Sequence, residues 1–539
     1  MIGCKHGIDI VGQGDVTSST GERDCSKQEA PCGFDVSEDY IETYTANPSP
    51  GWLFDSWEVC GITNGNICQF VVPASIVEQY SDLTMPFTVA KFRLPIEPLF
   101  LTNGDGTVQL PDTPAANEFA WFLRQLNTGS TSVAEINAHI DTNYLDSIPA
   151  SEWQSFFDTL RQSVPNAQVI DLISVTPNRV RAIVGDPADS SSGTLINLSS
   201  NYPSSGIKSL GASNFPQNLT NTASEDALLS LKQIANKFTA MADNTSLLVA
   251  KIDGNQCKPT IARKAKSPRP TGSIFKVWVL GALAQAIEDG VISASDELTF
   301  MSSEVVPAGA GINDTAPGTQ IPLVDMAALM MGNSDNTATD HIHERVGRTR
   351  IEAVLPQFGN RNPSGLIPFL STNEQFQVLW GLTPEEASDY AASGDSRQRD
   401  ILQNIIEPLG AVTAFPYNNE DALRTSSWSA SAMDVCQAYA GLRQFDNRSD
   451  AFSIIDFAFG SEVVFNTVRN KWDRVWSKGG SLANANGNYV FTLSWLFESD
   501  TRGAHVVVLM ANNGDGRAIE GAPIFSMASR IAEILDETN

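Results

Sequence analysis

The pattern of hydrophobic and polar positions changes character twice along the chain. Up to about residue 95, short alternating runs rich in aromatic residues, such as 44–57, are separated by turn sequences, which predicts β-strands. Between 115 and 215, three helical patterns (115–127, 132–140 and 151–163) precede three strand-like runs (168–175, 178–184 and 193–199). Helices followed by strands predict a small α+β domain.

The last stretch begins and ends with strand patterns. We expect a long helix at 224–242, two strands at 246–253 and 259–263, and apolar helices at 277–287 and 320–332. Strands at 474–478, 488–497 and 504–511 and an amphipathic helix at 523–535 close the chain. Two strands before the helices and three after them predict one sheet built from both ends of a domain. The expected domains are therefore 1–95, 96–220 and 221–539, in a multidomain α+β protein.

The charge balance restricts the partners. The chain of 539 residues has 35 Lys and Arg against 62 Asp and Glu, a formal charge of −27. Nucleic acids and anionic membranes attract basic surfaces, so we expect neither as a partner. No apolar run is long enough to cross a bilayer.

Cysteine usage points to an exported protein. Five of the seven cysteines lie within the first 68 residues, which predicts disulfides and a secreted or periplasmic location, with the export signal already removed. Cys60 and Cys68 flank a turn sequence and are expected to pair. Cys4 either carries a lipid, with Cys25 and Cys32 paired, or pairs with one of those two. Cys436 lies among small apolar residues and is expected to be a buried thiol.

The stretch with the clearest chemistry begins at residue 270. Ser273 and Lys276 are three positions apart at the start of the most apolar helix, so both side chains project from the same face. Burial disfavours the charged form of a lysine, which lets its amine accept a serine proton. Such a pair also occurs by chance, as in Ser205 and Lys208, where no buried helix follows.

Two later segments complete an ordered set of motifs. Ser334-Asp335-Asn336 follows the apolar helix at 320–332, and Lys478-Gly479-Gly480-Ser481 follows the strand pattern at 474–478. Alone, the first reads as a helix cap and the second as a turn at a strand end. Together with Ser273 and Lys276 they resemble the S-x-x-K, S-D-N and K-T-G motifs of the serine β-lactamase and penicillin-binding-protein superfamily. The resemblance implies a class A β-lactamase-like fold for the third domain.

The resemblance also implies roles for individual residues. Ser273 would attack the acyl carbon, Lys276 would accept its proton, and Ser334 would relay a proton to the leaving group. Lys478 would keep the site positive, and Asn336 would hold a substrate oxygen.

A second set of residues would bind the substrate oxyanion. The backbone at Ser273, Gly480 and Ser481 would supply the oxyanion hole. Gly479 stands where the superfamily usually has Thr, which removes a hydroxyl group that grips a substrate carboxylate. Glu374 is the one acidic residue in the region where class A enzymes have a deacylating glutamate, so we name it as the candidate base.

Two further resemblances concern the rest of the chain. The segments 368–376 and 427–436, together with the small domain at 115–215, carry the first of these. Through them residues 115–539 resemble the two-domain β-lactamase-like accessory serine hydrolases of clavulanic acid biosynthesis, whose first domain is isomerase-like (cystatin/NTF2-like). Residues 44–68 resemble the β modules of bacterial surface repeats, which implies attachment to the cell envelope through this part of the chain. The separation between Ser334 and Lys478 exceeds that usual in class A enzymes, so we expect extra loops between 356 and 425.

The expected function is that of a serine carboxylesterase acting on small or polymeric esters. The alternatives are a β-lactamase and a penicillin-binding sensor that is acylated without turnover. No G-x-S-x-G motif of an α/β-hydrolase is present. His341 and His343 are two positions apart on a predicted helix and face different sides, so we expect no metal site and no cofactor.

Overall fold

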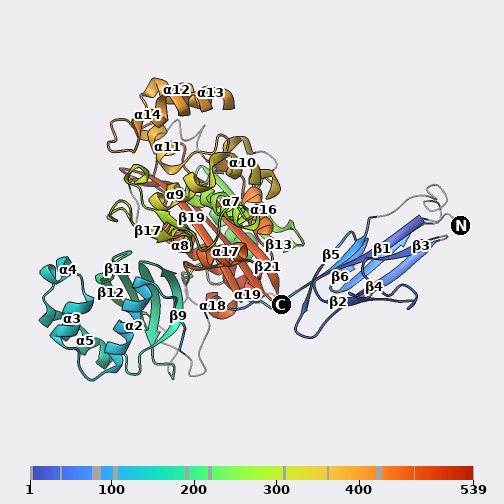
Figure 1. Cartoon of the computed structure of the whole chain (residues 1–539), viewed down its shortest axis with the longest axis horizontal. Helices are drawn as coiled ribbons and strands as arrows, with labels where there is room; N and C mark the ends of the chain where they lie inside the picture. The colour runs from blue at the N-terminus through green and yellow to red at the C-terminus, as the bar shows by residue number, and fades with distance from the viewer. Residues whose placement is uncertain are drawn as a thin grey trace. The chain divides into compact units, whose positions relative to one another are not determined.

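The computed structural model describes residues 4–36, 39–73, 75, 86–100, 107–188, 193–215, 221–307, 311–360, 363–419, 428–465 and 468–537 (Figure 1). The chain divides into two compact units. One comprises Met1–Glu97 and Ile252–Gln256, and the other comprises Pro98–Lys251 and Cys257–Asn539.

The first unit contains two four-stranded sheets, in the orders β3-β1-β8-β5 and β2-β4-β7-β6. Their strands are β1 (Cys4–Val11), β2 (Gly14–Ser18), β3 (Cys32–Val36), β4 (Tyr40–Pro48), β5 (Leu53–Glu58), β6 (Ile62–Asn64), β7 (Ile67–Val72) and β8 (Thr88–Arg93). Alternating side chains of both sheets, among them Ile8, Tyr44 and Phe92, form its core. The predicted N-terminal β module is confirmed.

The small α+β domain has its own hydrophobic core. Four antiparallel strands in the order β12-β11-β10-β9 pack against helices that contribute Phe119, Phe122 and Phe157 to that core. The elements are α2 (Pro114–Asn127), α3 (Val133–His139), α4 (Thr142–Ser147), α5 (Ala150–Ser163), β9 (Gln168–Thr176), β10 (Arg179–Gly185), β11 (Gly193–Ser200) and β12 (Ile207–Phe215). The predicted order of helices and then strands is correct.

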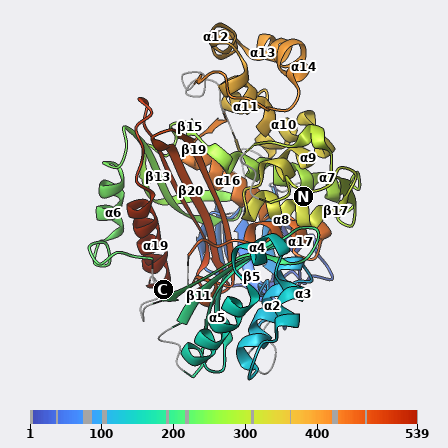
Figure 2. The same ribbon diagram turned by 90° about the vertical axis from the view of Figure 1, so that its left-hand side faces the viewer.

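The C-terminal domain is built around a five-stranded sheet in the order β14-β13-β21-β20-β19. Its strands are β13 (Asn244–Asp253), β14 (Gln256–Arg263), β19 (Arg474–Asn484), β20 (Gly487–Ser499) and β21 (Gly503–Asn512). The two ends of the domain therefore meet in one sheet, as the strand patterns predict. Helices α6 (Leu231–Phe238) and α19 (Gly521–Glu537) lie together on one face of this sheet (Figure 2).

The opposite face carries the helices that hold the candidate site. A turn of 3₁₀-helix, η1 (Gly272–Phe275), leads into α7 (Lys276–Glu288), whose side chains are almost all buried. Around it lie α8 (Leu323–Gly332), α9 (Asn336–Val346), α10 (Arg348–Gln357), α16 (Ala432–Leu442) and α17 (Asp450–Gly460). The short helix α18 (Val468–Lys471) contributes Val468 to the core that α6 and α19 share.

Short elements complete this domain. They are β15 (Arg269–Pro270), β16 (Glu297–Thr299), η2 (Ser302–Glu304), β17 (Gln320–Pro322), η3 (Pro363–Gly365), α11 (Thr372–Phe376), η4 (Gln377–Gly381), α12 (Pro384–Ala392), α13 (Asp395–Ile401), η5 (Leu402–Ile406), α14 (Glu407–Leu409) and β18 (Ser429–Ala430).

Two predicted elements differ from the structure. The helix expected at 224–242 is shorter, because α6 begins only after Ser230, which caps it together with Gln233. The region 356–425, expected to hold loops, contains helices α12 to α14. Thr383 and Glu386 form a capping box that starts α12, a signal that the sequence does carry.

The disulfides confirm one prediction, decide an open alternative and correct a third point. Cys60–Cys68 is the expected pair, and Cys25–Cys32 is one of the two arrangements that the sequence left open; both disulfides lie in the first unit. The prediction of a free thiol at Cys436 is wrong, because Cys436 on α16 is bonded to Cys257 on β14. Partners 179 positions apart leave no signal in a local pattern. Three disulfides are typical of proteins that fold in an oxidising environment such as the cell exterior or the periplasm. The side chain of Cys4 is outside the described part of the structure.

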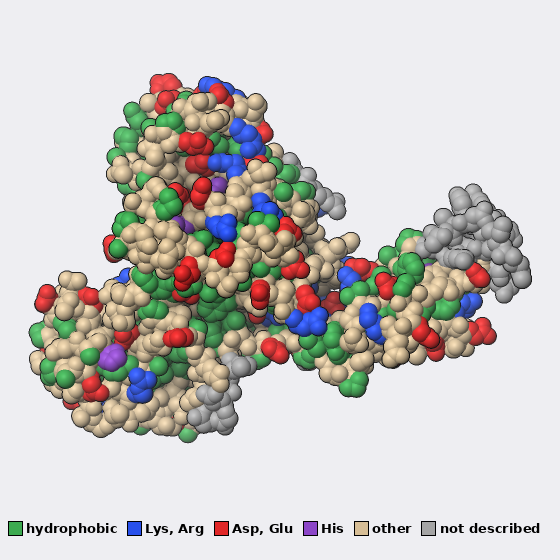
Figure 3. All heavy atoms as spheres, in the orientation of Figure 1, with side chains coloured by type: hydrophobic (Ala, Val, Ile, Leu, Met, Phe, Trp, Pro, Cys, Tyr) green, Lys and Arg blue, Asp and Glu red, His purple; other side chains and the backbone are tan. Residues whose placement is uncertain are grey.

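The described surface agrees with the acidic composition. On the face in Figure 3, Asp and Glu side chains are interspersed with Lys and Arg side chains. None of the described helices is both long and apolar enough to span a bilayer.

The long-range disulfide gives a prediction about stability. Replacing both Cys257 and Cys436 with Ser should lower the free energy of unfolding of the second unit by about 2–5 kcal/mol, because it releases a long closed loop. Denaturant unfolding followed by tryptophan fluorescence would measure the change. A matched double replacement of Cys60 and Cys68, which close a loop of 8 positions, should leave the second unit's transition unchanged. An unchanged transition in the Cys257 and Cys436 variant would contradict the prediction.

Candidate functional site

The first part of the candidate site is the turn that enters α7. Ser273 lies in η1, and Lys276 is the first residue of α7. Residues three apart in a 3₁₀ turn are nearly eclipsed, so the two side chains share one face. The turn is fixed from outside because Phe275 stacks on Trp428, with ring centroids 3.7 Å apart, and Thr271 N–H donates to the Trp428 carbonyl.

Lys276 is completely buried, and its amine contacts the turn that follows α8. Nζ donates to the Ser334 carbonyl at 2.7 Å, to Ser334 Oγ at 3.3 Å and to Asn336 Oδ1 at 2.8 Å. Burial lowers the pKa of Lys276 to about 7, and the charges of Asp335 and Asp340 only partly oppose this shift. A substantial fraction of the amine is therefore neutral near pH 7 and able to accept a proton.

A second buried lysine reaches the same hydroxyl group from the edge of the sheet. Lys478 is 3% exposed, and its Nζ donates to Ser334 Oγ at 2.8 Å and to the Gly479 carbonyl at 2.9 Å. Burial, and then the positive charge of Lys276, hold the pKa of Lys478 well below its ordinary value. The Ser334 hydroxyl group thus lies between two amines that both give up protons more readily than usual.

The hydroxyl groups of the cluster are accessible while the amines are not. Ser273, Ser334 and Asn336 are partly exposed, whereas both lysines are buried. Within the described residues, no hydrogen bond occupies Ser273 Oγ. Lys276 Nζ therefore binds the Ser334 turn and not Ser273 Oγ, and the predicted transfer of a proton from Ser273 to Lys276 would need that contact to form with substrate bound.

Backbone amides of η1 and β19 approach each other closely. A Cβ atom on Gly480 would lie 2.5 Å from Ser273 N, and one on Gly272 would lie 2.7 Å from Ser481 N. β19 is an edge strand, so part of its backbone faces η1 rather than another strand. The backbone nitrogens of Ser273 and Ser481 therefore lie where the turn meets the strand, and their role as an oxyanion hole stays a prediction.

The turn that carries Ser334 has an unusual backbone conformation. Ser334 has φ of 56°, in the left-handed region that a non-glycine residue adopts at a cost. Asp335, next in the chain, caps α9 by accepting a hydrogen bond from Ala338 N–H at 2.7 Å. This conformation turns both the carbonyl and the hydroxyl group of Ser334 toward the buried lysines.

The small α+β domain contacts this turn, which the sequence did not indicate. Asn178, 2% exposed at the β9–β10 turn, accepts hydrogen bonds at Oδ1 from Thr176 Oγ1 and from Asn333 Nδ2. Arg179 donates to the Gly332 carbonyl at 3.4 Å. Both residues that precede Ser334 are thus held by the small domain. Asn178 follows Pro177 in an ordinary turn sequence, so no local signal identifies it.

Glu374 is not joined to this cluster. Its Oε1 accepts from Arg348, and its Oε2 accepts from Ser371 N–H at 2.7 Å in the capping box that starts α11. Among the described residues, no hydrogen bond or ion pair links Glu374 to Ser273 or to either lysine. Its carboxylate therefore has a structural role at the start of α11.

The two histidines on α9 also have structural partners. Met301 N–H donates to His341 Nε2 at 2.9 Å, and His343 Nε2 lies 3.3 Å from the Phe369 carbonyl. Burial lowers the pKa of His343 to about 4. The described residues include no group of three or more His, Cys, Asp or Glu side chains that could hold a metal ion.

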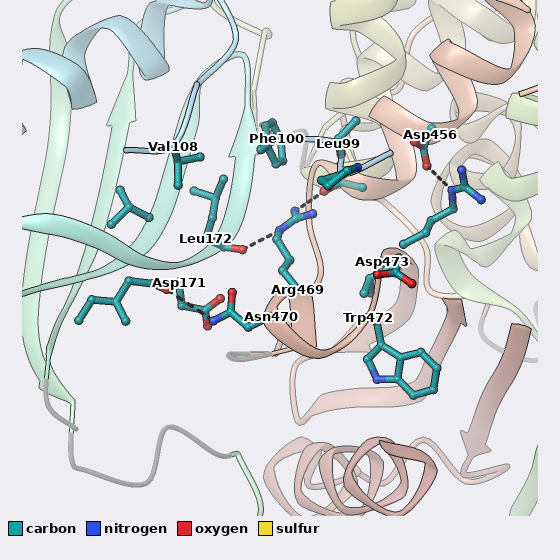
Figure 4. Close-up of a pocket in the computed structure, with 16 residues that line it drawn as sticks. Leu99, Phe100, Val108, Asp171, Leu172, Asp456, Arg469, Asn470, Trp472 and Asp473 are labelled. Atoms are coloured by element: carbon teal, nitrogen blue, oxygen red, sulfur yellow. Dashed lines mark hydrogen bonds and ion pairs between the residues drawn. The ribbon is translucent and has the colours of Figure 1, made fainter. Parts of the chain in front are cut away.

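A cavity of about 270 Å³ lies between the small domain and the C-terminal domain (Figure 4). Arg469 extends across it and donates to the Leu172 carbonyl at 2.6 Å and to the Gly460 carbonyl. Its guanidinium group also lies over the Phe100 ring at 5.0 Å. These contacts tie the two domains together, and none of the predicted site residues lines this cavity.

Comparisons with known sequences agree with this geometry. Residues 229–379 match the profile of the Beta-lactamase enzyme family, a range that includes Ser273, Lys276 and Ser334. This part of the C-terminal domain is therefore β-lactamase-like in sequence. Residues 110–177 match the family described as ORF 12 gene product N-terminal. No curated protein is significantly similar to the chain. The resemblance to the hydrolases of clavulanic acid biosynthesis stays a prediction.

Solved structures give distant likenesses in fold. A β-lactamase from Chitinophaga pinensis is 14% identical, covers 57% of this chain and 99% of its own, and has a TM-score of 0.39. A β-lactamase from Sphaerobacter thermophilus is 15% identical over 57% of this chain and 97% of its own, with a TM-score of 0.38. PBP-A is 14% identical over the same shares, with a TM-score of 0.37.

The close approach of η1 and β19 gives a prediction. In Gly480→Ala the new Cβ would clash with Thr271 O and lie 2.5 Å from Ser273 N, so the turn and the strand must separate. We expect a loss of about 1–3 kcal/mol in the free energy of unfolding, measured by denaturant titration.

Gly479→Ala is the matched control. Its Cβ would meet only Leu493 Cδ2 at 3.3 Å and Thr492 O at 3.5 Å, and the leucine side chain can move. Its stability should stay within about 0.5 kcal/mol of the original chain. Equal losses of stability in Gly480→Ala and Gly479→Ala would contradict the close approach of η1 to β19 at Gly480.

Proposed function

We propose that the chain is a serine hydrolase that forms an acyl-enzyme on Ser273 and that its activity is that of a carboxylesterase. The observation that supports this most directly is the buried Lys276 amine, which has a pKa of about 7 and lies one 3₁₀ turn after an accessible serine. Such an amine can act as a general base at neutral pH.

Acylation begins with proton transfer to Lys276. The neutral amine takes the proton of Ser273 Oγ as that oxygen attacks the ester carbonyl carbon. The carbonyl oxygen becomes an oxyanion and is stabilised by the N–H groups of Ser273 and Ser481. Asn336 Oδ1 accepts a hydrogen bond from Lys276, and the amide nitrogen of Asn336 would hold a substrate oxygen.

The leaving alcohol receives its proton from Ser334. As the bond between the acyl carbon and the ester oxygen breaks, the Ser334 hydroxyl group donates a proton to the departing alkoxide. A proton from Lys276 or Lys478 restores that hydroxyl group, because both amines lie against Ser334 Oγ. Water then attacks the acyl-enzyme and releases the carboxylic acid and Ser273.

Two observations favour esters over β-lactams. Gly479 offers no hydroxyl group to grip a substrate carboxylate, and Glu374 is held by Arg348 and by the start of α11. Without a placed carboxylate, a β-lactam acyl-enzyme would persist, since its leaving group stays attached. An ester loses its alcohol and leaves room for water.

β-Lactam hydrolysis is the second candidate. It is favoured by the match of residues 229–379 to the Beta-lactamase enzyme family and by the two amines beside Ser334. A protein that is acylated by penicillin without turnover would share the same first step.

A panel of three substrates distinguishes these activities. A nitrophenyl ester reports esterase activity, nitrocefin reports β-lactamase activity, and labelled penicillin reports trapping. We expect ester turnover that falls at least ~10³-fold in Ser273→Ala, since the nucleophile is removed. Nitrocefin turnover without ester turnover would replace the esterase assignment with the second candidate, and stoichiometric labelling alone would indicate a sensor.

The pKa of Lys276 predicts the pH dependence. Because the neutral amine is the base, kcat/KM for the ester should rise about tenfold per pH unit below pH ~7 and level off above it. Initial rates between pH ~5 and ~9 would show this profile. Lys276→Ala should lower kcat/KM by about 10²–10⁴-fold and abolish the rise of kcat/KM with pH below pH ~7. A flat profile for the unmodified enzyme would argue against Lys276 as the base.

A further inference from the structure

Ser334 contributes to the site from a strained backbone conformation. At φ of 56° its carbonyl and its hydroxyl group both contact Lys276, and the hydroxyl group also contacts Lys478. A non-glycine residue keeps such a conformation only where the surrounding structure holds it in place. The groups that hold the turn at Ser334 therefore decide whether both amines keep their contact with its hydroxyl group.

Asn178 of the small α+β domain holds the segment just before Ser334. Its Oδ1 accepts hydrogen bonds from Asn333 Nδ2 and, at 3.1 Å, from Thr176 Oγ1. Within the described residues, the bond to Asn178 is the one hydrogen bond that the Asn333 side chain makes. Asn178 is 2% exposed, so its removal would leave a buried amide donor without an acceptor.

The other end of the same side chain contacts the support behind Ser334. Asn178 Nδ2 donates to the Gly311 carbonyl at 3.5 Å. A Cβ atom on Gly311 would lie 2.8 Å from Asp335 Oδ2 and 3.2 Å from Asn178 Nδ2, so the backbone of residue 311 is packed between these two side chains. Asp335 follows Ser334 and is the N-cap of α9. Asn178 thus reaches the supports on both sides of Ser334.

The end of α8 leaves the turn little other freedom. A Cβ atom on Gly332 would clash with Ser461 Oγ and lie 2.6 Å from Thr176 Cγ2, so the chain is closely packed at this residue. The turn can therefore relax only beyond Gly332. That is the part of the chain that Asn178 holds.

The proposed mechanism gives this support a specific chemical effect. The Ser334 hydroxyl group donates the proton that the leaving alcohol receives. An aliphatic alkoxide is strongly basic and has to be protonated as it departs, whereas a nitrophenolate departs without a proton. A displaced Ser334 should therefore slow the hydrolysis of alkyl esters more than that of nitrophenyl esters.

We propose that Asn178 is a positioning residue for this reaction, which keeps the Ser334 hydroxyl group in place to protonate the leaving alcohol. This assignment rests on the proposed esterase function and adds a residue from the small α+β domain to the groups that determine it. Among the described residues, none of the hydrogen bonds of the Asn178 side chain reaches Ser273 or either lysine. Asn178 acts through Asn333 and the backbone around Ser334.

The test compares nitrophenyl, phenyl and ethyl butyrate, which share one acyl group and differ in the basicity of the leaving oxygen. We expect Asn178→Ala to lower kcat/KM less than ~3-fold for the nitrophenyl ester and at least ~10-fold for the ethyl ester, with the phenyl ester between them. Ser334→Ala should give the same order with larger losses. In the Ser334→Ala background, Asn178→Ala should cause no further loss, because both changes act on the same proton donor.

Asn333→Ala removes the donor of the same hydrogen bond and should reproduce the graded loss, so the test does not depend on the folding of one variant. Asn178→Asp keeps an acceptor oxygen of equal reach and should retain most of the ethyl butyrate activity. Asn201→Ala is the matched control, because Asn201 belongs to the same domain and donates to Asp141 at 2.8 Å. Its kcat/KM values should equal those of the unmodified enzyme.

The possible outcomes separate this role from the activity itself. Equal losses with all three esters in both Asn178→Ala and Asn333→Ala, or no loss in either variant, would overturn the positioning role and leave the esterase function standing. Absence of Ser273-dependent hydrolysis with every ester would instead overturn the proposed function.

Discussion

The rest of the site depends on one buried amine. Lys276 has no contact with water, and its three hydrogen-bond acceptors are a carbonyl, a hydroxyl group and an amide oxygen. Acceptors without a full negative charge satisfy the N–H groups, but they offset only part of the free-energy cost of removing an ammonium ion from water. The amine therefore loses its proton far more readily than a surface lysine, and the surrounding chain must supply these acceptors in fixed positions.

The domain supplies them from segments that are distant in sequence. α7 provides the amine, the turn between α8 and α9 provides the acceptors, and β19 brings Lys478 from near the end of the chain. The strained backbone of Ser334 persists because Asp335 caps α9 on one side and Asn333 is held on the other. Strain that is fixed from both sides is a common property of functional turns.

Local patterns were sufficient for most elements and for the parts of the site that lie within one element. The apolar α7, the strands of the five-stranded sheet and the pairing of Cys60 with Cys68 follow from periodicity and turn signals. Ser273 and Lys276 were predictable as neighbours because one turn of helix sets their spacing. The approach of Lys478 to Ser334 was predictable only through the resemblance in the order of three motifs.

What the sequence did not reveal depends on contacts between distant segments. Cys436 lies among small apolar residues, which is typical of a buried thiol. Only the fold shows that Cys257 lies next to it and forms a disulfide with it. The position of Glu374 in the chain suggests a catalytic base, whereas its carboxylate is paired with Arg348 on another helix.

The hydrogen bond from Asn333 to Asn178 has a consequence for how this protein can be divided. A fragment that begins at α6 would keep both lysines and both serines, yet Asn333 would lose its acceptor and the Gly332 carbonyl would lose Arg179. The small α+β domain thus supports the turn that carries Ser334 and is not a separable module. Any rearrangement that exchanges it for another domain must also rebuild the support beneath the Ser334 turn.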